Sequence, residues 1–383
     1  MNKIVSYVKK VSYCDLAISF LFIYWSNYHL YIGRSLSFRL FFWIVTLFII
    51  IYNVHKLRVY HVGLILSVSA IGILSLMLPA GSLYLDNESF FLFMIAGGIG
   101  SFLPVMIKNP KNLLVCFFIG IAPYTFMSLL QYSNSVDMGE AGDQYMVPAY
   151  LTFYLFSYFF LIFVFKKVRS SLLLSIFCLL IIFFLGTRGA IFSAILLVIL
   201  IICILLFKGI IKLKSTFKIL VGFFISLSLF IIYYLESVIL FISDQLGINS
   251  RLLYLLESNE GMHSDSRIEI YLKLWGALSK YPFGLGLRGD MYLTNGEYYA
   301  HNFFLELVAD FGFWAFLIIF LFFLLVKNSL LKIKNTDWLI VGILYFSITV
   351  FPRIFSGTFI HTLTLPFISL LFHIAYVAKK ERV

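Results

Sequence analysis

Ser237–Phe311 reads SVILFISDQLGINSRLLYLLESNEGMHSDSRIEIYLKLWGALSKYPFGLGLRGDMYLTNGEYYAHNFFLELVADF. This stretch stays largely polar from residue 237 to residue 299, whereas almost everything on either side consists of long apolar runs. An α-helix needs roughly 20 apolar residues to cross the hydrocarbon core of a bilayer. The pattern therefore predicts a membrane protein with one large polar loop late in the chain, where most of its chemistry should lie.

The composition excludes a soluble globular domain. The 383 residues are 62% hydrophobic and 12% charged, whereas soluble domains carry roughly a quarter charged residues. The apolar runs are continuous, unlike the alternating segments of a membrane β-barrel. We therefore predict an all-α polytopic membrane protein. All four cysteines lie in apolar runs with no histidine at ligand spacing, so the sequence indicates no zinc site.

The apolar runs predict about 12 transmembrane helices and divide the chain into three parts. Residues 1–236 hold transmembrane helices 1–9, residues 237–299 form the large outer loop, and residues 300–383 hold helices 10–12 and a cytoplasmic tail. The predicted spans are 12–31, 40–54, 62–80, 90–107, 113–131, 147–165, 171–186, 189–207, 219–236, 300–326, 338–355 and 358–378.

The charges predict how these helices are oriented. Alternate connecting segments, starting with the N-terminal one, hold most of the 29 basic residues, while Asp337 and Glu381 are the only ones of the 18 acidic residues placed there. Cytoplasmic segments carry such an excess of basic residues. Both termini are therefore predicted to be cytoplasmic, and the large loop to face outward. The net charge of +11 reflects this bias, and no nucleic-acid partner is expected.

The basic residues on the predicted outer side are mostly arginines, whereas those inside are mostly lysines. A guanidinium group binds phosphate or carboxylate through two parallel hydrogen bonds, which the lysine ammonium does not. The outer arginines therefore indicate a phosphate-bearing ligand, and the alternative is that they pair with acidic residues of the same loops. These arginines are Arg34, Arg39, Arg188, Arg251, Arg267, Arg288 and Arg353.

Two of these arginines stand at predicted helix starts. Arg188 follows Gly186 and Thr187 in a turn between two apolar runs, where helix amides and the dipole favour an anion. The alternative for Arg188 is that its side chain reaches lipid headgroups. Arg267 lies in a capping box, Ser266–Glu269. The box opens a predicted amphipathic helix whose apolar face holds Ile268, Tyr271, Leu272, Trp275 and Leu278.

His301 stands at the outer end of the predicted span 300–326 and is followed by Asn302, Glu306 and Asp310. An imidazole titrates near neutral pH, which suits a general base or a group that positions a hydroxyl. The alternative is a hydrogen-bonded structural role.

Three segments in order resemble the O-antigen ligase and polymerase superfamily of membrane glycosyltransferases. They are GTRGAIFSAILLV from residue 186, SRIEIYLKLWGALSKYPFGLGLRG from residue 266, and AHNFFLELVADFGFWAF from residue 300. The family pattern is a (Ser/Thr)-Arg-(Gly/Ala) turn, an Arg-led helix ending in Pro-x-x-Gly-x-Gly, and His-(Asn/Ser)-x-x-Leu with a later glycine. The resemblance covers residues 186–315 and does not separate polymerases from ligases.

The resemblance implies a GT-C-like fold in the bacterial inner membrane. It also implies glycosyl transfer, without metal or other cofactor, from an oligosaccharide linked to undecaprenyl pyrophosphate. Carried over by their motifs, Arg188 and Arg267 would stabilise the leaving pyrophosphate, and His301 would act as base or position the acceptor hydroxyl. The residues expected to contact phosphate or sugar are Arg288, Arg251, Asn302 and Glu306.

Three functions follow, and we favour the first. An O-antigen or related surface-polysaccharide polymerase would move the growing glycan onto an incoming lipid-linked repeat unit, and a Phe-, Ile- and Lys-rich chain suits a variable polysaccharide cluster. An O-antigen ligase would pass the glycan to lipid A-core. A flippase or transporter of the same lipid-linked sugars would place ionisable residues near mid-membrane, whereas here they gather at the outer margin. Binding of a chain-length regulator is left open.

Overall fold

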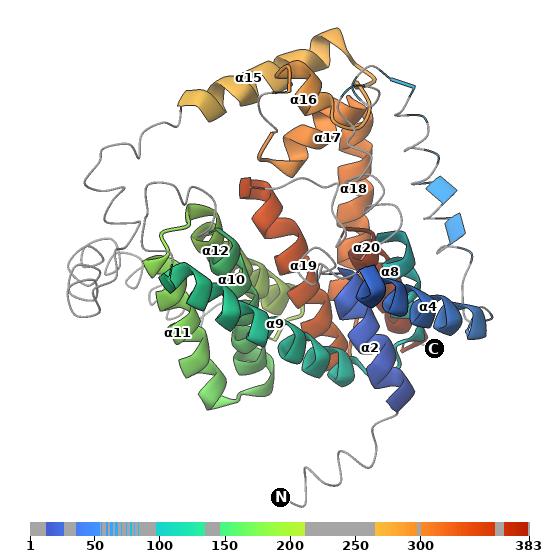
Figure 1. Ribbon diagram of the computed structural model, residues 1–383, viewed down its shortest axis with the longest axis vertical. Helices are drawn as coiled ribbons and strands as arrows, with labels where there is room; N and C mark the ends of the chain where they lie inside the picture. Colours follow the sequence, from blue (N-terminus) through green and yellow to red (C-terminus); the bar gives the residue numbers. More distant parts are fainter. Residues whose placement is uncertain are drawn as a thin grey trace, which may run out of the picture. The chain divides into compact units, whose positions relative to one another are not determined.

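The computed structural model describes residues 13–26, 36–53, 97–134, 146–210, 265–296, 300–356 and 364–381, with isolated positions between 55 and 83. Every regular element within these residues is helical (Figure 1). The predicted all-α class is therefore confirmed. The chain divides into two compact units, residues 1–120 with 267–383, and residues 121–266.

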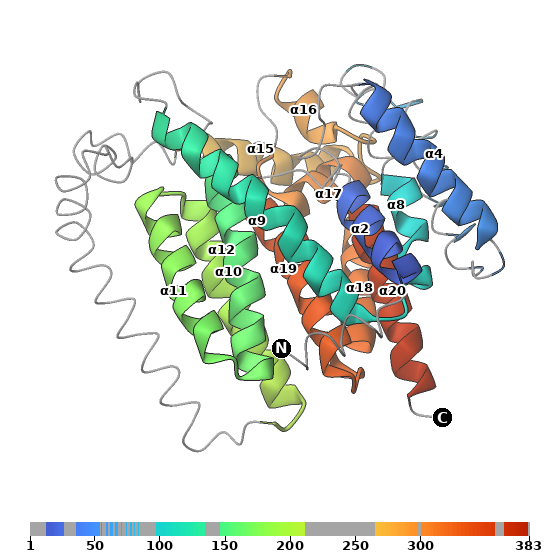
Figure 2. The same ribbon diagram turned by 60° about the horizontal axis from the view of Figure 1, so that its bottom comes forward.

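The second unit contains the end of α9 (Pro110–Asn134) and three further helices, α10 (Met146–Lys166), α11 (Arg169–Phe184) and α12 (Arg188–Phe207). α10 packs against both α11 and α12, and Figure 2 shows the three side by side. Lys167 and Gly186, both at positive φ, form the tight turns between them. These bounds lie within a few residues of the predicted spans.

Small residues line the contacts within this unit. Ala190, Ser193 and Ala194 on α12 are buried, as is Ser157 on α10. Small side chains let membrane helices approach closely. The hydroxyls are satisfied inside their own helices, since Ser157 Oγ donates to the Phe153 carbonyl at 2.8 Å. Internal pairing of this kind is what a lipid environment requires.

The first unit has α19 (Thr336–Ser356) at its centre. Its most apolar window is 89% buried, against 17% for α18 (Trp314–Val326), which continues as a π-helix over Lys327–Leu331. Tyr345 on α19 is fully buried and meets the ring of Phe22 at 5.2 Å. α19 is therefore a core helix, whereas α18 presents the kind of apolar surface that faces lipid.

Four further helices belong to this unit: α2 (Tyr13–Ser26), α4 (Leu36–Tyr52), α8 (Gly98–Phe102) and α20 (Thr364–Lys380). α20 packs against α18 and α19, α8 and α2 pack against α20, and α4 packs against α2. A short 3₁₀ helix over Pro104–Met106 follows α8. Trp25 Nε1 donates to Thr46 Oγ1 at 2.8 Å and joins α2 to α4. Ser369 Oγ donates to the Ser101 carbonyl and joins α20 to α8.

Asp15 is an acidic residue within an apolar helix, and its contacts are structural. The side chain is 5% exposed and accepts the Lys108 amide at 2.6 Å and the Asn112 side chain at 2.8 Å. Both donors flank the start of α9. Asp15 therefore anchors α2 to the segment that leads into α9, since buried charges persist where hydrogen bonds compensate them.

Five described helices are long and apolar enough to cross a membrane: Pro110–Tyr132, Met146–Lys166, Arg188–Phe207, Trp314–Leu331 and Thr336–Phe355. Shorter apolar helices cover Cys14–Trp25, Phe41–Tyr52 and Arg169–Phe184. The span predicted at 219–236, much of that at 62–80, and the outer loop before residue 265 lie outside the described residues. The total of about 12 spans therefore stays a prediction.

The predicted helix over 300–326 is two helices in the structure. α17 (Phe303–Phe311) ends at Gly312, and α18 begins at Trp314. Gly312 has φ 56° and ψ −131°, which no helix can contain. The apolar run hides this break because its hydropathy does not change at residue 312. The break matters for the site, since α17 is too short to span a bilayer.

Candidate functional site

The turn over residues 281–289 folds back onto the C-terminal end of α17. The amides of Leu285 and Gly286 donate to the carbonyls of Ala309 and Asp310, each at 3.0 Å. The Phe313 amide donates in return to the Pro282 carbonyl at 2.9 Å. The glycine-rich end of the predicted outer loop is thus bonded, backbone to backbone, to the helix that follows His301.

Gly284 and Gly312 make this contact possible. Gly284 has φ 84°, and a Cβ there would lie 2.1 Å from the Asp310 carbonyl oxygen. A Cβ on Gly312 would lie 2.1 Å from the Pro282 carbonyl oxygen. Both positions combine a left-handed backbone with a close backbone approach, which glycine alone tolerates. The segment Pro282–Gly286, which reads PFGLG with one residue between the proline and the first glycine, and the later Gly312 therefore belong to one contact.

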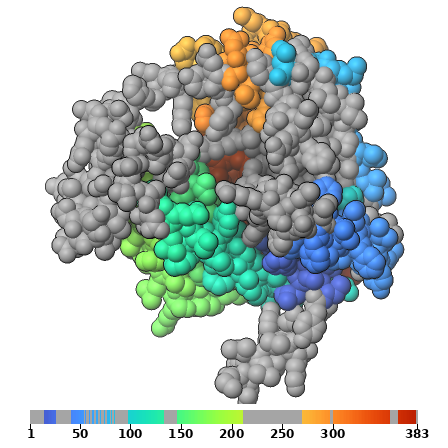
Figure 3. Space-filling view, in the orientation of Figure 1, coloured from blue at the N-terminus to red at the C-terminus, as the bar shows by residue number. Residues whose placement is uncertain are grey.

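α15 (Asp265–Lys280) confirms the helix predicted there, and only part of its predicted apolar face is covered by the protein. Ile270 and Leu274 are buried and pack with Ala300 and Ala309. Leu272 and Trp275, on the predicted apolar face, are 68% and 55% exposed. The helix is apolar on two sides, and spacing alone does not decide which side the protein covers. Figure 3 shows this part of the unit at the surface.

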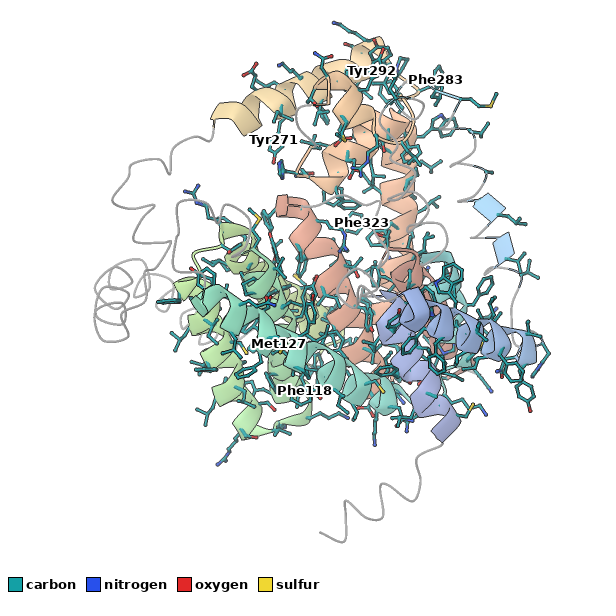
Figure 4. All side chains as sticks on the ribbon, viewed as in Figure 1. Phe118, Met127, Tyr271, Phe283, Tyr292 and Phe323 are labelled. Carbon is teal, nitrogen blue, oxygen red and sulfur yellow. The ribbon has the colours of Figure 1, made fainter. Side chains whose placement is uncertain are left out.

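The outward side of α15 continues onto neighbouring aromatic residues. The Trp275 ring lies edge-on to Phe316 of α18, with ring centres 6.5 Å apart. Phe283, labelled in Figure 4, is 75% exposed in the turn after α15. Aromatic residues gather in this way at membrane–water interfaces. Such a surface suits an amphipathic helix that lies at a membrane interface.

His301 and Asn302 form the start of α17. Asn302 is its N-cap, and Asn302 Oδ1 accepts the amides of Phe304 at 3.0 Å and Leu305 at 3.2 Å. His301 is half-buried and left-handed, with φ 50°. A left-handed conformation is uncommon outside glycine and persists where surrounding contacts fix it. The capped helix behind His301 and the buried Ala300 before it supply such contacts.

Three buried carboxyl groups lie behind this turn. Asp290 in α16 (Gly289–Leu293) and Glu306 and Asp310 in α17 are each 1% exposed. Burial, and then the carboxylates of Glu306 and Asp290, raise the pKa of Asp310 well above its ordinary value. Burial also raises the pKa of Asp290, while the Ala300 amide and the Arg288 guanidinium act in the opposite direction. Within the described residues, no three such side chains are arranged to share a metal.

Arg288 is the N-cap residue of α16 and adopts a left-handed conformation, with φ 69°. Its side chain is half-buried, close enough to Asp290 to influence that carboxyl. Its Nε is buried and donates no hydrogen bond to any described residue. The backbone thus holds Arg288 at the turn, with its guanidinium near Asp290.

Arg188 belongs to the second unit and begins α12, as the sequence predicts. It is exposed, and Thr187 before it is extended, with φ −82° and ψ 101°. The Thr187 side chain caps no helix amide, and its buried hydroxyl has no hydrogen-bond partner among the described residues. The first amides of α12 therefore face the same end as Arg188, as an anion site at a helix start requires.

The remaining predicted site residues fall into two groups. Arg288, His301, Asn302 and Glu306 are all carried by the turn, α16 and α17. Arg267 lies in the first turn of α15, but its side chain is outside the described residues, as is the whole of Arg251. Glu306 is so deeply buried that it faces the protein interior, which suits support of the site better than direct contact with a sugar.

Arg353 was grouped with the outer arginines, and the structure gives it a local role. It follows Pro352 inside α19, and a proline has no N–H to bond the carbonyl one turn earlier. Arg353 Nη1 donates to the Ile348 carbonyl at 3.3 Å and to the Thr349 carbonyl. The guanidinium thus supplies the donor that Pro352 lacks.

Residues 172–320 match the protein-family model described as O-antigen ligase. These residues are similar to the O-antigen ligase family, and we call them the O-antigen ligase family region. This region includes Arg188 at the start of α12, Arg288 in the turn and His301 before α17, so the match confirms the resemblance to the O-antigen ligase and polymerase superfamily. No curated protein and no solved structure matches the chain.

The O-antigen ligase family region and the apolar helices together indicate that the chain is a bacterial membrane protein of glycosyltransferase type. The site residues that sequence reasoning did not select are Asp290 and Asp310. Asp290 follows the Gly-rich motif directly, and Asp310 lies nine residues after His301 on α17. Nothing in the sequence marks them as buried, because aspartates in proteins are mostly exposed.

Proposed function

We propose that this protein is a polymerase of O-antigen or a related surface polysaccharide in the bacterial inner membrane. It would transfer the growing glycan from undecaprenyl pyrophosphate to an incoming lipid-linked repeat unit on the periplasmic side. The supporting observation is that Arg288, His301 and Asn302 share one hydrogen-bonded frame, the turn on α17, inside the O-antigen ligase family region.

The transfer would need no covalent bond between the protein and the sugar. A hydroxyl of the incoming sugar attacks the anomeric carbon of the growing chain, and a new glycosidic C–O bond forms. The C–O bond to the pyrophosphate breaks, the electron pair leaves with undecaprenyl pyrophosphate, and the hydroxyl proton is lost. A neutral His301 imidazole would accept that proton or hold the hydroxyl in place.

The arginines would stabilise the leaving group. Charge on the pyrophosphate grows as the bond breaks, and fixed guanidinium groups and helix amides stabilise such charge most when they are already oriented. Arg188 begins α12 and Arg288 is the N-cap residue of α16, so the backbone places both arginines beside helix amides. Arg267, in the first turn of α15, is placed where the dipole disfavours a cation, and a bound anion would remove that conflict.

Ligase activity is the second candidate, because the matching family model is described as O-antigen ligase. In that case the acceptor hydroxyl would belong to lipid A-core, and the donor and arginine roles would be unchanged.

Reconstitution with purified lipid-linked repeat units separates these functions. We expect a ladder of longer lipid-linked glycans without lipid A-core. Transfer that occurs only when lipid A-core is added would identify a ligase. Labelled lipid-linked sugar that crosses the vesicle bilayer without any transfer would identify a flippase and overturn the proposal.

A further inference from the structure

We propose that Asp290 and Asp310 are positioning residues, whose carboxyl groups hold the backbone amides that fix Arg288 and His301 in the site. The proposal rests on the proposed function for its kinetic consequence. It rests on hydrogen-bond geometry alone for its structural part.

Asp310 fixes the backbone at Arg288. Asp310 Oδ1 accepts the Gly289 amide at 2.7 Å, and the Arg288 amide also points at this carboxyl. The fit leaves no spare room, since a Cβ on Gly289 would lie 2.7 Å from the Ala309 carbonyl oxygen and 3.1 Å from Asp310 Oδ1. The left-handed conformation of Arg288 is thus held from α17.

Asp290 fixes the backbone at His301. Asp290 Oδ2 accepts the Ala300 amide at 2.7 Å, ten residues along the chain. On the other side of His301, Asn302 caps α17. The strained backbone of His301 is therefore fixed at both neighbours, as a group that must present an imidazole in one direction requires.

The two contacts close a ring of hydrogen bonds. Asp310 on α17 holds Gly289, the next residue Asp290 holds Ala300, and Ala300 leads through His301 back into α17. Loss of the Asp310 carboxyl would mainly release Arg288, and loss of the Asp290 carboxyl would mainly release His301. Two carboxyls buried side by side are costly, and such strain is commonly retained at functional sites.

The ionisation states agree with this role. Glu306 on the same helix and Asp290 on α16 face Asp310, and with burial they favour its protonated form, while Arg288 favours the ionised form of Asp290. An asparagine has the shape of a protonated aspartic acid and keeps one acceptor oxygen. Asparagine should therefore replace Asp310 with little loss, whereas alanine should not.

The test combines amide hydrogen exchange and kinetics on the full-length protein in detergent. The variants are Asp290→Ala, Asp290→Asn, Asp310→Ala and Asp310→Asn, with Glu269→Gln as control because Glu269 is 70% exposed on α15. We expect Asp290→Ala to speed exchange about tenfold in peptides covering Ala300, and Asp310→Ala to do so in peptides covering Gly289. The asparagine variants should restore most of the protection.

The kinetic arm separates positioning from mere stability. Each alanine variant should lower kcat about a hundredfold while KM stays within about threefold, since the lost geometry acts on the transition state. Asparagine should rescue kcat to within about tenfold for Asp310.

Several outcomes would overturn the proposal. Alanine variants that exchange like Glu269→Gln would show that the carboxyls do not hold these amides. Faster exchange with unchanged kcat would make both residues structural only. If alanine variants do not fold, asparagine variants that lose both protection and turnover would contradict the acceptor role. A wild-type protein without transfer activity would refute the proposed function instead, while exchange would still decide the hydrogen bonds.

Discussion

Asn302 has two candidate roles, as the N-cap of α17 and as a contact to the sugar. The His-Asn pair resembles a catalytic motif, yet Asn302 Oδ1 already accepts hydrogen bonds from two backbone amides of α17. Its side-chain NH₂ stays compatible with the predicted sugar contact. The two roles differ in which substitutions they tolerate, because serine and aspartate also cap helices whereas alanine does not.

We predict that Asn302→Ala lowers the unfolding free energy by about 1 kcal/mol and that Asn302→Ser restores most of it. The measurement is the thermal unfolding midpoint in detergent, followed by transfer activity for each variant. If capping is the whole role, activity will follow stability in both variants. A stable Asn302→Ser protein that is inactive would instead establish the sugar contact.

At the scale of elements, the contact between the turn and α17 is the feature on which the site depends. It consists of backbone hydrogen bonds at two glycines, so its loss should displace Arg288 and His301 together. α15 offers a matched control, since Gly276 is helical and a Cβ there meets nothing within 4 Å.

We predict that Gly284→Ala and Gly312→Ala each destabilise the protein by more than about 2 kcal/mol and remove activity, because strain adds to the clash. Gly276→Ala should be neutral or stabilise α15 by about 0.5–1 kcal/mol, since alanine is the better helix former. Unfolding midpoints of the purified variants check both. Equal midpoints for all three would contradict the close backbone approach.

The elements themselves were largely predictable, and their contacts were not. Arg188 at the start of α12 and Pro282 after α15 follow from turn and breaker chemistry that a sequence displays directly. The contact between the turn and α17 was not predictable, because it is made by main-chain hydrogen bonds and these leave no pattern of side chains in the sequence. The apolar spacing of α15 likewise did not show which apolar residues the protein covers, because this helix is apolar on two sides.

At the scale of the whole molecule, the buried acids link stability to pH. Asp310 has a pKa raised above its ordinary 3.8, with Glu306, Asp290 and then Arg288 as the charged groups around the pair. The folded protein therefore keeps this proton longer than the unfolded chain does. Its stabilising contribution is complete below the ordinary value and is lost as the pH rises through the folded-state pKa.

We predict that the unfolding midpoint of the wild type falls as the pH is raised from about 4 towards 8, and that Asp310→Asn makes this fall shallower. Glu269→Gln should keep the wild-type slope, since that carboxyl is exposed. Unfolding midpoints at a series of pH values give the slopes. Identical slopes for wild type and Asp310→Asn would mean that Asp310 ionises normally.

The measurement that tests the account most directly is elongation of purified lipid-linked repeat units by reconstituted wild type and by three variants, His301→Ala, Arg188→Ala and Arg267→Ala. The account predicts a ladder of lipid-linked products for the wild type and a loss of about a hundredfold or more in rate for each variant, at equal amounts of folded protein. Wild-type ladders from all three variants would contradict the site, and no elongation by the wild type would contradict the polymerase.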